Sequence, residues 1–127
     1  MPIQVNIDKP QRLVTTRCSG ELSDDDLAAL QERFETDPDF SPKFSRICDL
    51  TKVTVVDISD DVLNQWAADP IIDANARHAV VCSKPAVMTS VLDFVARSRR
   101  YSRDISVFPN YDQAKNWIDK REETFEA

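Results

Sequence analysis

Hydrophobic and polar residues alternate at the start of the chain, a pattern typical of a β-strand with one buried face. The first such run is Ile3–Ile7, and the turn-forming residues 8–11 follow it. A second run, rich in Val and Thr, extends from Arg12 to about Cys18 and is closed by Gly20. Because the connection between the two runs is short, we predict an antiparallel hairpin.

The spacing of hydrophobic residues becomes helical after Ser23. Ser23 is a good N-cap, and residues 24–26 are all Asp, which the positive end of a helix dipole favours. We therefore predict an amphipathic helix that ends near Thr36. Its apolar residues are Leu27, Leu30 and Phe34.

Strands and helices then alternate to the end of the chain. Three strands are predicted, at Phe44–Leu50, His78–Ser83 and Asp104–Phe108. Residues 53–58 either prolong the first of these strands or form a buried loop. Three helices are predicted: one capped by Ser59 and ended by Pro70, one begun at Ser83, and one that carries Tyr111 and continues to about Lys120.

This order, β-β-α-β-α-β-α-β-α, indicates an α/β fold with a mixed, mostly parallel sheet. Helical crossovers join parallel strands with right-handed connections, so only the first strand is expected to be antiparallel. The 127 residues fit a single domain over residues 1–127, in which we expect the tail 121–127 to fray.

Composition indicates where in the cell the protein is expected and which classes of partner it is not expected to bind. No apolar run approaches the roughly 20 residues of a membrane span, and the N-terminus lacks the basic start and apolar core of a signal peptide. We therefore expect a cytoplasmic protein without a membrane span. A net charge of −6 argues against general nucleic-acid binding, which depends on neutralising phosphates.

Few residues suit catalysis or metal binding. Gly20 is the only glycine, which excludes the P-loop and the dinucleotide-binding fingerprint, and His78 is the only histidine, so no site with two imidazoles can form. His78 begins an apolar strand, and a structural role is favoured over that of a base. We expect no catalytic residue, no metal site and no cofactor; an enzyme that uses Asp49, Lys84 or Cys82 remains an alternative without a mechanism.

The three cysteines are expected to be buried and reduced. Cys18, Cys48 and Cys82 lie in strand-like segments, are odd in number and form no Cys-x-x-Cys pair. A free cysteine in such a setting acts as a small hydrophobic residue. A reactive cysteine is the less favoured alternative.

The candidate site follows from the topology. In an open α/β sheet, ligands bind outside the carboxyl ends of the strands. Polar residues at the predicted ends form a candidate interaction loop, Asp49, Thr51, Asp57 and Ser59, and a pair of candidate anion or ligand contacts, Ser83 and Lys84. The two helix N-termini at Ser59 and Ser83 are able to hold a small anion, although simple capping is favoured.

The chain resembles the STAS, or SpoIIAA-like, family of anti-sigma-factor antagonists. Ile47–Ser59 is similar to the family's hydrophobic strand followed by Asp-Leu-Ser and then Asp-Ser-Ser-Gly at the start of a helix, and Val107–Ala114 is similar to its closing strand, turn and helix. The resemblance implies a SpoIIAA-like fold. It also implies that Ser59 matches a serine whose phosphorylation controls partner binding. Ile58 and Asp60 depart from that motif, because they replace a serine and the glycine.

Two functions are therefore carried forward. The first is a non-enzymatic regulatory or protein-interaction module. The second is a binding domain for a small apolar or lipid-like ligand, which requires a cavity beneath a group of residues on the third helix that otherwise form its packed core face: Val87, Met88, Leu92 and Phe94.

Self-association is a further expectation. Seven acidic residues lie between positions 24 and 39, and a basic cluster lies at the C-terminal end of the third helix: Arg97, Arg99, Arg100, Tyr101 and Arg103. This asymmetry is suited to a homodimer in which one copy's cluster meets the other's first helix. Two solvated helix faces are the commoner alternative.

Overall fold

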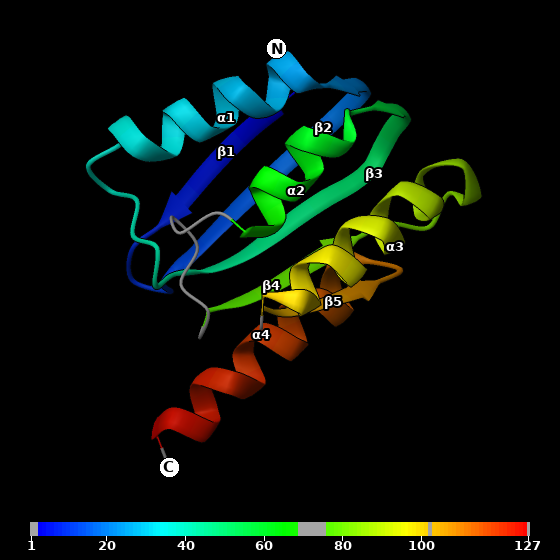
Figure 1. Ribbon diagram of the computed structural model, residues 1–127. Helices are drawn as coiled ribbons and strands as arrows, with labels where there is room; N and C mark the ends of the chain where they lie inside the picture. Colours follow the sequence, from blue (N-terminus) through cyan, green and yellow to red (C-terminus); the bar gives the residue numbers. More distant parts are fainter. Residues whose placement is uncertain (1–2, 69–75, 102, 127) are drawn as a thin grey trace.

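The computed structural model describes residues 3–68, 76–101 and 103–126, with side chains described as far as residue 120. The predicted helix end at Pro70 lies outside these residues. The elements follow the predicted order (Figure 1). They are β1 (Ile3–Asp8), β2 (Leu13–Ser23), α1 (Asp24–Thr36), β3 (Ser45–Asp57), α2 (Asp60–Ala68), β4 (Arg77–Val81), α3 (Pro85–Arg100), β5 (Asp104–Phe108) and α4 (Tyr111–Glu126).

The strands form one five-stranded sheet in the order β1-β2-β3-β4-β5. The β1–β2 pair is antiparallel, and the other three pairs are parallel. The predicted fold class, hairpin and strand directions are therefore confirmed.

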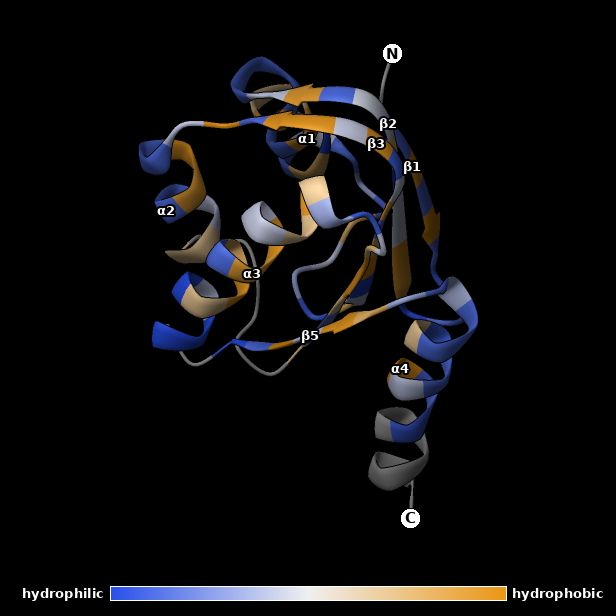
Figure 2. Cartoon of the chain, turned by 90° about the vertical axis from the view of Figure 1, so that its right-hand side faces the viewer, coloured by the Kyte–Doolittle hydropathy of each residue, from blue (hydrophilic) through white to orange (hydrophobic). Residues whose placement is uncertain are grey.

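The connections decide which face of the sheet each helix covers. Each successive parallel strand is added on the same side of the previous one, so right-handed crossovers place α1, α2 and α3 on one face. The last helix, α4, lies on the opposite face (Figure 2). We call these the cavity face and the α4 face.

Both faces of the central strands are buried, which explains their nearly continuous hydrophobic sequence. Successive side chains of a strand point to opposite faces. On β3, Ile47 therefore packs under Ala114 and Ile118 of α4, whereas its neighbours Arg46 and Cys48 face α1, α2 and α3.

One predicted strand end is wrong, because β2 continues past Cys18 to Ser23. Strand β3 continues past Leu50 to Asp57, which is the first of the two alternatives for residues 53–58, and the two strands remain paired over this length. Gly20 does not close the strand, because its positive φ of 71° fits an irregularity in the β2–β3 register after which pairing resumes.

The start of the third helix also differs from the prediction. Strand β4 ends at Val81, and the N-cap of α3 is Lys84 rather than Ser83. Pro85 explains the difference: it suits the first helical position and keeps the residue before it extended, which is the conformation of an N-cap. The last helix, α4, ends at Glu126.

No helix in the described part of the chain is long and apolar enough to cross a membrane.

Candidate functional site

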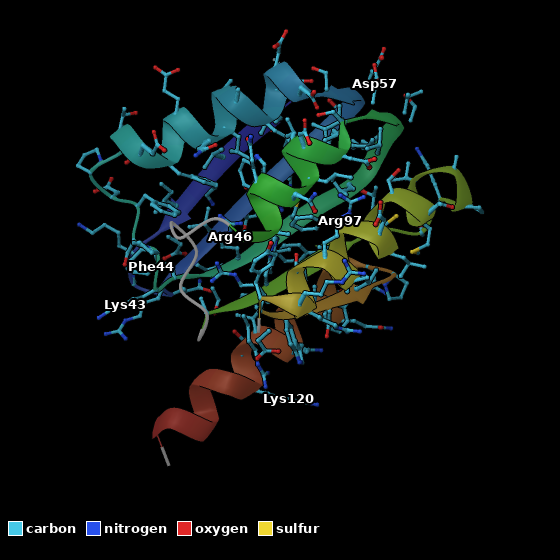
Figure 3. All side chains as sticks on the ribbon, viewed as in Figure 1. Lys43, Phe44, Arg46, Asp57, Arg97 and Lys120 are labelled. Carbon is cyan, nitrogen blue, oxygen red and sulfur yellow. The ribbon has the colours of Figure 1, made fainter. Side chains whose placement is uncertain are left out.

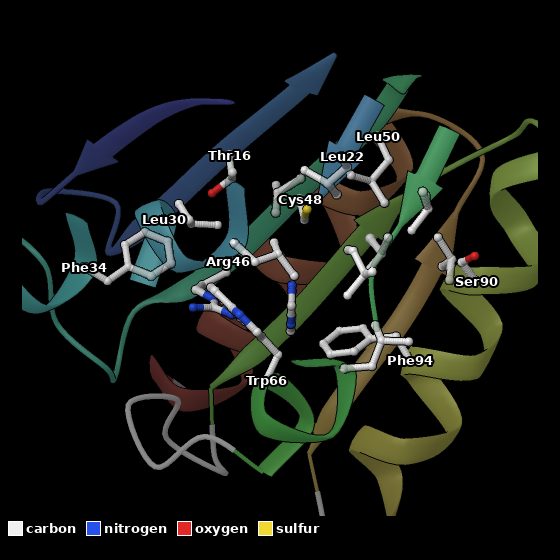
Figure 4. Close-up of a pocket in the computed structure, with 18 residues that line it drawn as sticks. Thr16, Leu22, Leu30, Phe34, Arg46, Cys48, Leu50, Trp66, Ser90 and Phe94 are labelled. Atoms are coloured by element: carbon white, nitrogen blue, oxygen red, sulfur yellow. The ribbon is translucent and has the colours of Figure 1, made fainter. Parts of the chain in front are cut away.

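A cavity of about 100 Å³ lies between the cavity face of the sheet and helices α1, α2 and α3 (Figure 4). Its side chains are mostly apolar. The strands contribute Thr16, Arg46, Cys48, Leu50, His78 and Val80, among others. The helices contribute Leu27, Leu30, Phe34, Leu63, Trp66, Ser90, Val91 and Phe94.

The cavity exists because α2 packs on α3 rather than flat against the sheet. Helix α2 begins three residues after the extended β3 ends and turns its buried side chains, Leu63 and Trp66, toward the space above the strands. Side chains from α1 and α3 close the two sides of this space. The long β3 therefore helps to position the helix that covers the cavity.

Arg97 of α3 lies beside α2 (Figure 3) and is the centre of a polar network that joins the two helices. The Arg97 guanidinium donates to both carboxylate oxygens of Asp93 on its own helix, at 2.9 and 3.1 Å. It also donates to the Asp60 carboxylate at 2.9 Å, the Asp60 carbonyl at 3.1 Å and the Asn64 side-chain oxygen at 3.0 Å, all on α2. Hydrogen bonds to Asp93 and Asp60 raise the pKa of Arg97, so it remains charged.

Arg46 brings a charge into the wall of the cavity. Arg46 is only 7% exposed, although arginine is seldom buried. The guanidinium carbon lies 5.2 Å from the centre of the Phe34 ring and 5.9 Å from the centre of the Trp66 ring. Contacts between a cation and aromatic faces stabilise a charge that is removed from water.

His78 lies beside Arg46 and is electrically neutral at pH 7. The two residues are register partners on β3 and β4, and the His78 ring meets the Phe94 ring edge-on with centres 6.2 Å apart. Burial, followed by repulsion from Arg46, lowers the pKa of His78 well below 6.5. His78 therefore adds no positive charge to the cavity near neutral pH.

All three cysteines are free thiols, with Cys18 and Cys82 buried and Cys48 partly buried in the cavity wall. A hydrogen bond with Cys48, followed by burial, raises the pKa of Cys18, and burial also raises the pKa of Cys82. The same hydrogen bond with Cys18 lowers the pKa of Cys48. Protonated thiols are poor nucleophiles, so the settings of Cys18 and Cys82 match the expected role of small hydrophobic side chains.

The structure separates the residues of the predicted interaction loop. Asp49 lies in the middle of β3, where one carboxylate oxygen accepts hydrogen bonds from the amide of Thr51 at 3.0 Å and from its hydroxyl at 2.7 Å. From Asp49 to Asp57 the strand rises about 26 Å at the usual rise per residue. Asp57 therefore lies at the far end of β3 (Figure 3), and the four residues do not form one site.

Ser59 caps α2, as the sequence predicts. Its hydroxyl accepts a hydrogen bond from the Val62 amide at 3.3 Å, and its own amide donates to the Asp24 carboxylate at 2.8 Å. The Asp24 contact joins the starts of α1 and α2. Ser59 and Asp60 are exposed, so this end of the molecule presents a negatively charged surface.

Ser83 and Lys84 also have separate environments. Ser83 is exposed and lies outside α3. The Lys84 ammonium group donates to the Val53 carbonyl at 3.5 Å. Because β4 pairs only with residues 46–49 of β3, this contact covers part of the β3 edge that extends past β4.

The predicted third-helix residues contribute unequally to the cavity. Phe94 lines it, but Val87 is fully buried in the core and Leu92 is 53% exposed. The sequence analysis missed Arg46, whose position inside an otherwise hydrophobic strand was the available signal. In the described residues, no group of three or more His, Cys, Asp or Glu side chains is placed to hold a metal ion.

Comparisons with known proteins identify the fold. No protein-family model and no curated protein sequence matches the chain. Among solved structures, the chain is similar to an uncharacterized protein of the DUF3478 family with a SpoIIAA-like fold from Shewanella loihica PV-4. The TM-score is 0.60 at 15% identity, over 91% of this chain and 93% of the other. The chain therefore has a SpoIIAA-like fold, as the sequence resemblance predicts.

Proposed function

We propose that this protein is a non-enzymatic regulatory binding module whose cavity takes a small apolar ligand. The observation that carries the proposal is the cavity of about 100 Å³ on the helix-covered face of the sheet. Ligand sites in proteins are typically concave and mostly apolar, with few polar groups that fix orientation. The lining of this cavity has that composition, with Arg46, His78 and Thr16 among its polar members.

Native mass spectrometry of the protein purified from its own host tests this proposal. Ser90 lines the cavity from α3 and is partly buried, whereas the adjacent Thr89 is exposed and does not line it. We expect wild type and Thr89→Phe to retain a small molecule that Ser90→Phe loses, because the new ring fills the cavity. Retention of the same molecule by Ser90→Phe contradicts a site in this cavity.

We propose a second function, protein binding, for the surface around Ser59. Its support is the exposure of Ser59 at an acidic end of the molecule, together with the sequence resemblance to a phosphorylated serine. A phosphoryl group on Ser59 gains from the start of α2 but is repelled by the Asp24 carboxylate, which already accepts the Ser59 amide. Phosphorylation is therefore expected to loosen the contact between the starts of α1 and α2.

Mass analysis of the Ser59-containing peptide from the native host tests the modification. If a phosphorylated form is found, Ser59→Ala and Ser59→Asp are expected to differ in partner capture. Identical capture by both variants removes the switch from the proposal.

Self-association through the basic cluster stays a prediction, and three arginines of the cluster already make hydrogen bonds within the chain. Arg97 is engaged with α2, Arg99 donates to the Ile105 carbonyl at 3.3 Å, and Arg103 donates to the Ala67 carbonyl at 3.4 Å. These contacts within the chain compete with contacts to a second copy. A monomer in sedimentation at low ionic strength would exclude the homodimer.

A further inference from the structure

The charges of the cavity favour a negatively charged ligand. Among the described lining residues, Arg46 is the one charged side chain, and no carboxylate lines the cavity. His78 is neutral near pH 7, so it neither adds charge nor competes for an anion. Because Arg46 is only 7% exposed and its surroundings are mostly apolar, water screens the field of its guanidinium less than it would at the protein surface.

Arg46 carries hydrogen-bond donors that suit an acid group. Its guanidinium carbon lies 5.2 Å from the centre of the Phe34 ring and 5.9 Å from the centre of the Trp66 ring, within the range of cation–π contacts. Its N–H donors lie in the plane of the group, where they match the two oxygens of a carboxylate. A guanidinium has five such donors, so Arg46 is able to keep its partner within the protein and bind a ligand as well.

The size of the cavity limits the apolar part of the ligand. An engineered apolar cavity of about 150 Å³ in another protein accommodates benzene, and the cavity here measures about 100 Å³. One ring or a short branched chain is therefore the appropriate scale. Leu63, Trp66 and Phe94 provide apolar surface for such a group.

We propose that the cavity binds compact apolar monocarboxylates, with the carboxylate held by Arg46 and the apolar group under α2. This inference rests on the proposed ligand-binding function and adds the chemical class of the ligand. It predicts that, of two ligands with the same shape, the cavity binds the negatively charged one more tightly.

Benzoate and benzamide provide the matched probes, because they share a ring and differ in charge at pH 7. Titration of isotope-labelled wild-type protein, followed by NMR, yields both affinities. Charge-assisted hydrogen bonds are stronger than neutral ones, so we expect benzoate to bind at least about tenfold more tightly than benzamide. Arg46→Met is expected to remove this preference while binding of benzamide persists.

The outcomes separate the two proposals. Equal affinities for benzoate and benzamide in the wild-type protein overturn the carboxylate inference and leave the ligand-binding function standing. If neither benzoate nor benzamide binds, the result counts against both the carboxylate inference and the ligand-binding function. The wild-type comparison does not depend on the fold of Arg46→Met, and Arg46→Lys, which keeps the charge but loses the planar donors, is expected to bind benzoate with intermediate affinity.

Discussion

Arg46 helps to set the charge of its neighbour His78. They are register partners on parallel strands, and both are buried on the cavity face. Arg46 is charged, as arginine is throughout the usual pH range, and its guanidinium lies near the Phe34 and Trp66 rings. His78 gives up its proton, because burial and the adjacent guanidinium both disfavour a second positive charge. The cavity therefore carries one cation and one neutral imidazole near pH 7.

The neutral state of His78 predicts a pH dependence of stability. The folded-state pKa lies well below 6.5, so the unfolded chain binds more protons as the pH falls below 6.5. The contribution of His78 to stability is fully present above pH 6.5 and is lost at lower pH, by at most about 1.4 kcal/mol per pH unit for one proton. Urea unfolding between pH 7.5 and 5.5 measures this loss, which His78→Gln should reduce. An equal slope in the variant would assign the effect to other groups.

The cap formed by Ser59 predicts different stabilities for two substitutions. Ser59→Ala removes the acceptor for the Val62 amide and is expected to lower the free energy of unfolding by about 1 kcal/mol. Aspartate is an equally good cap, but Asp24 lies close by, so Ser59→Asp should fall between wild type and Ser59→Ala. Chemical denaturation gives the order, and a wild-type-like Ser59→Ala would show that the cap contributes little.

At the scale of elements, α2 is the part of the fold whose position matters most for the site. It covers the cavity with Leu63 and Trp66, and it packs mainly on α3. The hydrogen bonds of Arg97 to Asp60 and Asn64 determine where its first turns lie. A helix held above a sheet by a neighbouring helix leaves space beneath it, and here that space is the cavity.

Loss of the Arg97 network should therefore weaken the attachment of α2 to α3. We expect Arg97→Met to increase amide hydrogen exchange along Asp60–Ala68 while the exchange of β3 and β4 changes little. Arg100→Met is the matched control, because Arg100 is exposed on the same helix. Unchanged exchange in α2 of Arg97→Met would show that apolar packing alone holds this helix in place.

At the scale of the whole molecule, local patterns predicted the order and direction of the elements. The N-cap Ser23 and the alternation in β1 are local signals, and both appear in the structure. The full length of β2 was missed, because Gly20 marks a strand end in sequence but adopts a positive φ within a continuing strand.

The site was harder to predict because it depends on contacts between distant segments. Arg46 acquires its environment from Phe34 on α1, Trp66 on α2 and His78 on β4. No spacing in the sequence encodes that combination. The predicted loop residues were grouped by the rule that ligands bind outside the carboxyl ends of strands, and the extension of β3 to Asp57 separates Asp49 from Ser59.

The two tryptophans allow the central claim, a ligand cavity on one face of the sheet, to be tested in a single measurement. Trp66 lines the cavity, whereas Trp117 packs on Phe108 at the α4 face. Their indole N–H resonances report on the two faces separately during an NMR titration with benzyl alcohol. We predict a saturable shift of the Trp66 resonance with little change at Trp117. A Trp66 resonance that does not move, or one that moves no more than that of Trp117, would contradict the account.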